Sequence, residues 1–262
     1  MTLSHQQKIT TVLLAIYWPA LFIFAHIPVP RVVQESDISD KSLHFLAYLI
    51  LVFLLWFTVS DGKKANWRRA SPWWVFLIMV VYGIVDEWLQ SYAAERTCDA
   101  WDFLADLTST FTGLVLFSVL SFWPAGLVVT VIIIFGVANI SRADLTDLLP
   151  AASAVFHLFA YAILTTFWVQ CLRLFMPRNH LRQNAVKWLT AALAAPLALV
   201  LTVKLFSVIL GKDFAVQDMI ISIGAIVAVV VTIHLGRLVS RGRRVKGLRT
   251  RAPSQASFQE PS

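Results

Sequence analysis

Residues 43–60 read LHFLAYLILVFLLWFTVS, and no charged side chain interrupts the run. A helix needs about 17–25 mostly apolar residues to cross the hydrocarbon core of a bilayer, so this stretch is long enough to span one. Apolar and polar residues do not alternate along it, which favours a helix over a strand of a membrane barrel. The fold therefore depends on how many such stretches the chain contains.

Seven further stretches are comparably long and apolar. In chain order, the full set is 9–27, 43–60, 73–91, 103–122, 124–140, 153–172, 188–210 and 215–236. The fourth and fifth are separated only by Trp123-Pro124, where we expect a tight turn. Each stretch is long enough for one transmembrane helix.

The composition supports the same interpretation. Of the 262 residues, 58% are hydrophobic and only 14% are charged, and the mean hydropathy is +0.71. Soluble domains usually contain about 25% charged residues. These values exclude a soluble enzyme, a disordered protein and a disulfide-rich secreted domain. We predict an all-α integral membrane protein with about eight transmembrane helices, whose immediate partners are membrane lipids.

Basic residues are spread unevenly over the connecting segments. If both termini are cytoplasmic, 16 of the 22 Lys and Arg residues lie on the cytoplasmic side. The opposite side receives five, which are Arg31, Lys41, Arg96, Arg142 and Lys212. Because cytoplasmic loops are enriched in Lys and Arg, this distribution predicts a bacterial inner (cytoplasmic) membrane protein with cytoplasmic N- and C-termini. Since the positive charge lies between apolar stretches, we expect no nucleic-acid partner despite the pI of 9.7.

The two halves of the chain resemble each other weakly. HFLAYLIL at 44–51 recurs as HLFAYAIL at 157–164, an offset of 113. Four spans per copy would give both copies the same orientation, so we predict a 4+4 parallel repeat about an axis along the membrane normal. The predicted organisation is a four-helix unit at 1–122, a second at 123–240, and a basic, disordered cytoplasmic tail at 241–262.

Ionisable residues are costly inside a bilayer, so their positions indicate a candidate site. In the first half of the chain they gather at the predicted outer ends of three helices. The catalytic candidates are His44, Glu87 and Asp102, and the ligand-binding candidates are Lys41, Tyr48, Gln90, Arg96, Asp99 and Asp106. Together they predict an extracytoplasmic polar pocket.

Helical spacing predicts which side chains share a face. His44 and Tyr48 are four residues apart, and Glu87 and Gln90 are three apart, on a face that also carries Gly83. Each pair is therefore expected to point toward the same pocket.

The acidic residues of the fourth span form a similar row. Asp99, Asp102 and Asp106 recur at intervals of three and four. Asp106 should lie about one turn, roughly 5 Å, deeper in the membrane than Asp102. A carboxylate at that depth needs a partner such as Arg96 or His44, or must be protonated.

The order of these residues resembles a known family of membrane proteins. The chain contains D-K-x-x-H-F-x-x-Y at 40–48, G-x-x-x-E-x-x-Q at 83–90 and R-x-x-D-x-x-D-x-x-A at 96–105. This pattern is similar to that of the VanZ-like family, which consists of small bacterial membrane proteins with four spans. Where the family usually has Asn and then Gly after the last Asp, this chain has Asp106 and Ser109.

The resemblance covers roughly residues 9–122. It implies a role at the cell envelope and a link to low-level resistance to the glycopeptide antibiotic teicoplanin. The second half has Val203 and Phe206 where Glu87 and Gln90 would fall. We therefore expect the second unit to be degenerate and inactive.

Three classes of function are compatible with the polar residues. The one that we favour is binding or chemical modification of a cell-envelope lipid or glycan headgroup, or of a glycopeptide ligand. Lys41 and Arg96 would contact its phosphate or carboxylate. His44 or Glu87 would serve as general base, with Asp102 orienting that base.

The alternatives are a transporter or structural scaffold, and a metal-dependent membrane enzyme. A metal site would draw on the oxygen-rich set of His44, Glu87, Asp99 and Asp102. Such a set suits a hard or borderline cation. No close ligand pair such as H-x-x-x-H occurs, so the sequence assigns no metal ligand and no cofactor. A transport site usually lies near the midplane, whereas these residues are expected near the surface. Catalysis and oligomeric state stay open.

Overall fold

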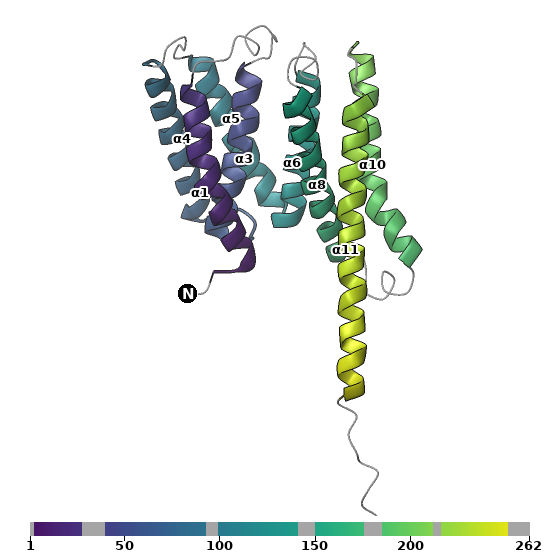
Figure 1. Ribbon diagram of the computed structural model, residues 1–262. Helices are drawn as coiled ribbons and strands as arrows, with labels where there is room; N and C mark the ends of the chain where they lie inside the picture. Colours follow the sequence, from purple (N-terminus) through teal and green to yellow (C-terminus); the bar gives the residue numbers. More distant parts are fainter. Residues whose placement is uncertain are drawn as a thin grey trace, which may run out of the picture.

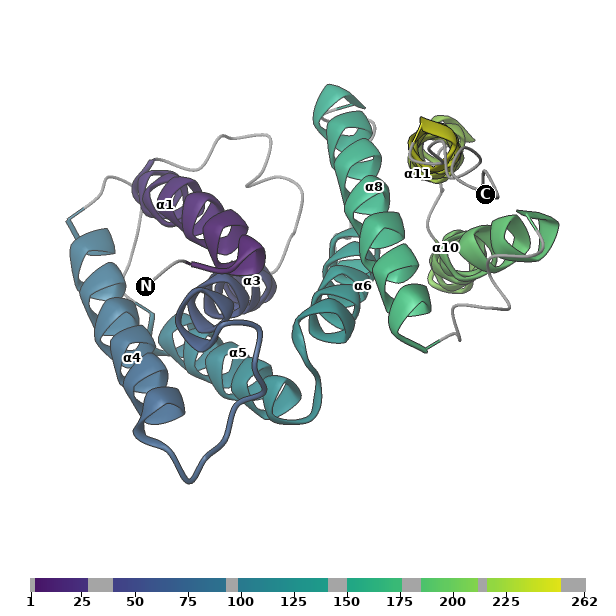
Figure 2. The ribbon, with the colours of Figure 1, turned by 90° about the horizontal axis from the view of Figure 1, so that it is seen from below.

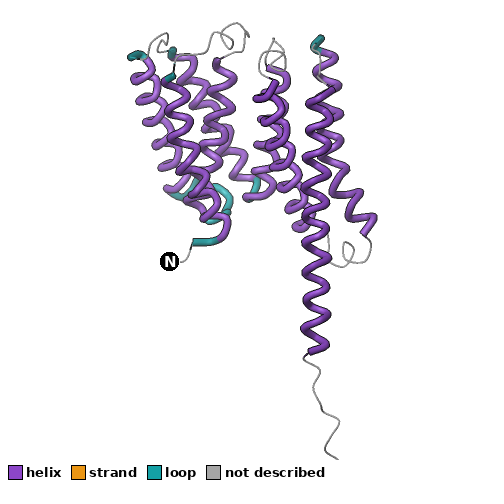
Figure 3. The backbone as a smooth tube through the Cα atoms, in the orientation of Figure 1, coloured by secondary structure: helices purple, strands orange, loops and turns teal. Residues whose placement is uncertain are grey.

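The computed structural model describes residues 3–27, 40–92, 99–140, 150–175, 185–211 and 216–250. Within these segments every regular element is a helix and none is a strand (Figure 3). The eight helices found there are all long and apolar enough to cross a membrane. The predicted all-α architecture with eight possible spans is therefore confirmed for the described part of the chain.

The helices lie close to the predicted apolar stretches (Figure 1). They are α1 (His5–His26), α3 (Asp40–Ser60), α4 (Ala70–Gln90), α5 (Ala100–Val119), α6 (Phe122–Ile140), α8 (Pro150–Phe175), α10 (Ala185–Ile209) and α11 (Val216–Thr250). Most begin a few residues before the apolar stretch itself.

The helices form two groups that stand side by side when viewed along their axes (Figure 2). In the first group, α3 packs against α1, α4 and α5. In the second, α8 packs against α6, α10 and α11. Helix α6 also packs against α3 and α5, so it connects the two groups.

Helix α3 occupies the centre of the first group because it is apolar on all sides. Leu49, Leu51, Val52 and Phe57 face different directions around the helix, and none has exposed surface. In its most apolar stretch 56% of the residues are buried, against 6% in α1. A helix that is hydrophobic all round is typically buried among other helices.

Two glycines allow helices to approach closely, as small residues do in membrane proteins. A Cβ atom on Gly113 of α5 would lie 2.7 Å from Val52 Cγ1 of α3. A Cβ atom on Gly126 of α6 would overlap the aromatic ring of Phe167 in α8. These contacts set the α3–α5 and α6–α8 distances.

The predicted turn at Trp123-Pro124 is wrong. Helix α5 ends at Val119 and α6 begins at Phe122, so the break lies at residues 120–121. Pro124 then falls in the first turn of α6. The first four N–H groups of a helix have no partner within it, so a proline is tolerated there.

The end of the last helix also differs from the expectation. Helix α11 continues to Thr250, so residues 241–250, which were expected to belong to a disordered tail, are helical. Arg, Lys and Leu are good helix formers, and cations near a helix C-terminus interact favourably with its dipole. The remainder of the predicted tail, 251–262, lies outside the described residues.

Gly126→Ala should destabilise the protein because the added methyl group would overlap the Phe167 ring. Overpacking of this kind typically costs about 1–3 kcal/mol, so the thermal unfolding midpoint in detergent should fall. The matched control is Gly224→Ala in α11, where no atom lies within 4 Å of the added Cβ. The control should keep or raise the midpoint, since Ala favours a helix over Gly. Equal midpoints for the two variants would contradict the close α6–α8 contact.

Candidate functional site

The starts of α3 and α5 and the end of α4 lie at one end of the molecule (Figure 1). The polar and charged residues buried in this region include Asp86, Glu87, Gln90, Asp102 and Asp106. Burial of ionisable groups is costly unless they are hydrogen-bonded or paired. The contacts of these residues therefore decide what the site can do.

Asp99 caps the start of α5. Its Oδ1 accepts a hydrogen bond from the backbone N–H of Trp101 at 2.9 Å, and its Oδ2 accepts one from the Lys41 ammonium at 3.0 Å. The Trp101 N–H and the Lys41 ammonium together hold the pKa of the Asp99 carboxyl below its usual value. Asp102 follows in the first turn, with Oδ1 3.6 Å from the same ammonium. Acidic groups are favoured here because a helix N-terminus carries partial positive charge.

A deeper contact joins α3 to α5. His44 Nδ1 lies 3.2 Å from Asp106 Oδ1, within hydrogen-bond distance. Asp106 is only 1% exposed, so the imidazole N–H supplies the partner that this carboxylate needs. Asp106 is thus the carboxylate that orients His44 at Nδ1, a role predicted for Asp102. Asp102 does not take this role because it lies in the first turn of α5, where its carboxylate is beside Lys41.

Asp86, which was not among the predicted site residues, is the centre of a second buried contact set. Asp86 Oδ2 accepts hydrogen bonds from the Tyr48 hydroxyl at 3.3 Å and from Gln90 Nε2 at 3.0 Å. His26 of α1 approaches from the other side, with Nδ1 4.0 Å from Asp86 Oδ1. The sequence pattern that could have indicated Asp86 is the four-residue spacing of Tyr82, Asp86 and Gln90, which places them on one helix face.

Glu87 links α4 to the start of α5. Its Oε2 accepts a hydrogen bond from the backbone N–H of Asp99 at 3.1 Å. Gly83, one turn earlier on the same face, makes room for α5: a Cβ there would lie 3.2 Å from the Phe103 ring and 3.7 Å from Asp106 Oδ2. The predicted face of Gly83, Glu87 and Gln90 is therefore buried against α5 and α3.

His44, Glu87 and Asp106 meet at the centre of the region. Each offers one potential ligand atom, and these atoms all lie within 4.8 Å of one another. Three carboxylate oxygens in the region, Asp86 Oδ1, Glu87 Oε1 and Asp106 Oδ2, are buried without a hydrogen-bond partner among the described residues. An imidazole and several carboxylates in such proximity can move protons or hold a cation.

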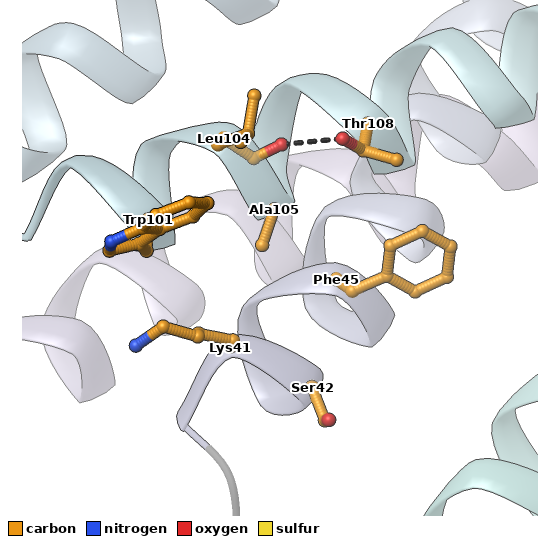
Figure 4. Close-up of a pocket in the computed structure, with 7 residues that line it drawn as sticks. All are labelled: Lys41, Ser42, Phe45, Trp101, Leu104, Ala105 and Thr108. Carbon is orange, nitrogen blue, oxygen red and sulfur yellow. Dashed lines mark hydrogen bonds between the residues drawn. The ribbon is translucent and has the colours of Figure 1, made fainter.

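A groove of about 390 Å³ lies between α3 and α5 (Figure 4). Its lining residues are Lys41, Ser42 and Phe45 from α3, and Trp101, Leu104, Ala105 and Thr108 from α5. Apart from Lys41 and two hydroxyl groups, the lining is apolar. Lys41 belongs both to this groove and to the ion pairs at the start of α5.

The predicted site residues thus fall into three contact sets. Lys41, Asp99 and Asp102 form a rim, His44, Glu87 and Asp106 form an inner group, and Tyr48 and Gln90 contact Asp86. Arg96 lies outside the described residues. Helical spacing predicted which residues share a face, but not these pairings between helices.

The second group of helices contains a similar His and Tyr without the carboxylates of α4. His157 stacks on Tyr161, and His157 Nε2 lies 3.5 Å from Asp218 Oδ2. Ser222, one turn after Asp218, places its hydroxyl 3.2 Å from His157 Nδ1. Val203, which was aligned with Glu87, is buried and apolar.

Tyr48→Phe should lower the thermal stability because Asp86, buried beside it, loses a hydrogen-bond donor. Leaving a buried acceptor with one bond fewer costs about 1–3 kcal/mol. The matched control is Tyr161→Phe, because the Tyr161 hydroxyl has no hydrogen-bond partner among the described residues. Thermal unfolding of both variants in detergent checks the difference. A larger loss in Tyr161→Phe would contradict the Tyr48–Asp86 contact.

Comparisons with known proteins add no further assignment to this site. No protein-family model, no curated protein and no solved structure matches the chain. The function is therefore argued from the residues and contacts described above.

Proposed function

We propose that this protein lies in a bacterial inner membrane and that its outer polar region binds the headgroup of a cell-envelope lipid or glycan. The observation that carries the proposal is the position of Lys41. Its ammonium lies between Asp99 and Asp102, and the same side chain lines the apolar groove between α3 and α5. A ligand with a polar head and an apolar chain would find complementary surfaces for both parts at this point.

The charges of the rim favour a headgroup that donates hydrogen bonds. Among the described residues there, the carboxylates of Asp99 and Asp102 outnumber the single ammonium of Lys41. Carboxylates accept hydrogen bonds from hydroxyl and amino groups, which glycans and amino-bearing headgroups supply. A phosphate group that contacted Lys41 would also lie next to the carboxylates of Asp99 and Asp102, which would repel it.

The inner group would act on a bound headgroup if the protein is an enzyme. His44 is the better candidate for the general base, because the hydrogen bond from Nδ1 to Asp106 sets its orientation and tautomer. Glu87 is the second candidate, with one oxygen already held by the Asp99 N–H. Both side chains are close enough to exchange a proton with a common group.

The proposal includes membership in the VanZ-like family and a link to glycopeptide (teicoplanin) resistance. The three motifs within residues 40–105 support it. Most of the motif residues that the structure describes meet at one end of α3, α4 and α5, which agrees with a common function. A site near the helix ends favours headgroup recognition over transport, whose sites usually lie near the midplane.

We also propose that the chain arose by internal duplication, as a parallel 4+4 repeat. The helix pairs support it: α1–α3, α3–α5, α4–α5, α3–α4 and α1–α4 correspond to α6–α8, α8–α11, α10–α11, α8–α10 and α6–α10. The ring pairs agree as well. The ring centroids of His44 and Tyr48 are 6.4 Å apart, with an angle of 18° between the ring planes. For His157 and Tyr161 the distance is 5.9 Å and the angle 11°.

The proposed orientation places both termini in the cytoplasm. The connection between α3 and α4, at the end opposite the polar site, lines a hollow of about 750 Å³ that contains Lys63, Lys64, Arg68 and Arg69. No carboxylate in the described segments forms an ion pair with these four cations. The start of α1 and the end of α11 lie at this same end (Figure 1). Cytoplasmic loops are enriched in such residues.

Lys41→Gln should reduce ligand retention without loss of stability. We expect native mass spectra of the full chain, purified from its own membrane, to show a bound envelope lipid or glycan. Lys41 holds the two rim carboxylates that would accept hydrogen bonds from the headgroup, so its loss should lower the bound fraction about tenfold. Lys64→Gln, at the opposite end, is the matched control and should retain the ligand. Equal retention by both variants, or a loss that only parallels a lower melting temperature, would reject the proposed binding site.

Cysteine labelling tests the orientation with two positions near opposite ends of α4. In a background with Cys98 and Cys171 replaced by Ala, Lys64→Cys should react with a membrane-impermeant thiol reagent only after the membrane is opened. Ser91→Cys should react in intact cells. Both residues are exposed, so accessibility within the protein does not limit either reaction. The reverse pattern would place the polar site in the cytoplasm.

A further inference from the structure

We propose that His44, Glu87 and Asp106 bind one divalent metal ion. These residues come from α3, α4 and α5, so the ion would join three helices at the polar site. The proposal does not depend on headgroup binding at the rim and the groove, and it makes His44 a metal ligand in place of a general base.

The geometry is close to what a metal centre requires. The three potential ligand atoms lie within 4.8 Å of one another. At metal–ligand distances of about 2.0–2.2 Å, opposite ligands of one ion are about 4.2 Å apart and neighbouring ligands are closer. Side-chain adjustments of about half an ångström would therefore bring all three atoms into coordination distance.

Unsatisfied carboxylate oxygens provide an independent indication of a ligand. Glu87 is 4% exposed and Asp106 is 1% exposed, yet Glu87 Oε1 and Asp106 Oδ2 have no hydrogen-bond partner in the described structure. Asp106 Oδ2 faces Gly83, one turn from Glu87 on α4. Buried unpaired carboxylate oxygens are strongly unfavourable, and a cation between them would remove that cost.

One ligand is already positioned by an outer contact. Asp99 N–H donates to Glu87 Oε2, and a contact of this kind orients a ligand in a metal site and raises metal affinity. Glu87 is thus held through one oxygen, with Oε1 available for coordination. His44 Nδ1 and Asp106 Oδ1 lie 3.2 Å apart, so two members of the proposed ligand set are already close to each other.

The donor set indicates the class of ion. One imidazole nitrogen with carboxylate oxygens suits borderline divalent ions such as Zn²⁺ or Mn²⁺. It contains no thiolate, which Cu⁺ would favour, and too few oxygens for a dedicated Ca²⁺ cage. We expect Zn²⁺ and Mn²⁺ to bind more tightly than Ca²⁺.

The second group of helices provides an internal comparison. There His157 lies near Asp218, and Val203 is buried where the alignment places Glu87. This second histidine therefore lacks the α4 carboxylate that completes the first set. An ion held by the first group alone should bind with a stoichiometry of about one per chain.

Metal binding to the full chain, purified with an affinity tag that contains no histidine, tests the proposal. After treatment with a chelator, the protein in lipid nanodiscs is dialysed against low micromolar ZnCl₂ or MnCl₂ alone, and bound metal is measured by mass spectrometry. The wild type should bind about one ion per chain. Glu87→Gln and Asp106→Asn should each lower the affinity by about 100-fold. Asp218→Asn is the matched control and should leave the affinity unchanged.

Thermal unfolding keeps the test valid if a variant folds poorly. With metal present, the melting temperature of the wild type and of Asp218→Asn should rise, as it does for any ligand that binds only the folded state. In chelator, Glu87→Gln should be at least as stable as the wild type, because it removes an uncompensated buried charge. Addition of metal should not raise the melting temperature of Glu87→Gln. A lower stability of Glu87→Gln in chelator would show a purely structural carboxylate and overturn the proposal, as would equal metal affinity in all four proteins.

Discussion

The contact between His44 and Asp106 is the interaction on which the polar site depends. It joins α3 to α5 near the start of both helices, whose backbones approach closely at Gly113 and Val52. Asp106 cannot reach water, so its carboxylate has to be compensated by neighbouring side chains. The remaining groups of the site are arranged around this contact, with Glu87 added from α4.

The second group of helices shows that this packing does not need the full set of carboxylates. The helix pairs of the two groups correspond, but α10 presents the buried Val203 where α4 presents Glu87. Buried carboxylates contribute little to packing and are costly in a bilayer. Their concentration in one group is therefore explained better by a ligand than by stability.

Much of the fold and part of the site could be predicted from the sequence. The eight spans followed from length and apolarity, and helical spacing placed Asp102 and Asp106 on the buried face of α5. The break between α5 and α6 was misplaced because a proline is compatible with a first helical turn. Asp86 was not predicted as a site residue because its importance depends on Tyr48, which reaches it from another helix.

The sequence by itself determined the number of spans and the residues on each helix face. Both follow from local properties, the thickness of the bilayer and the period of the α-helix. Only the tertiary structure decided that Asp106 meets His44 and that Glu87 joins them, whereas Asp102 lies beside Lys41. These pairings depend on how far each helix is rotated and how closely it approaches its neighbours. Rotation and approach are set by side chains packing between helices that are distant in sequence.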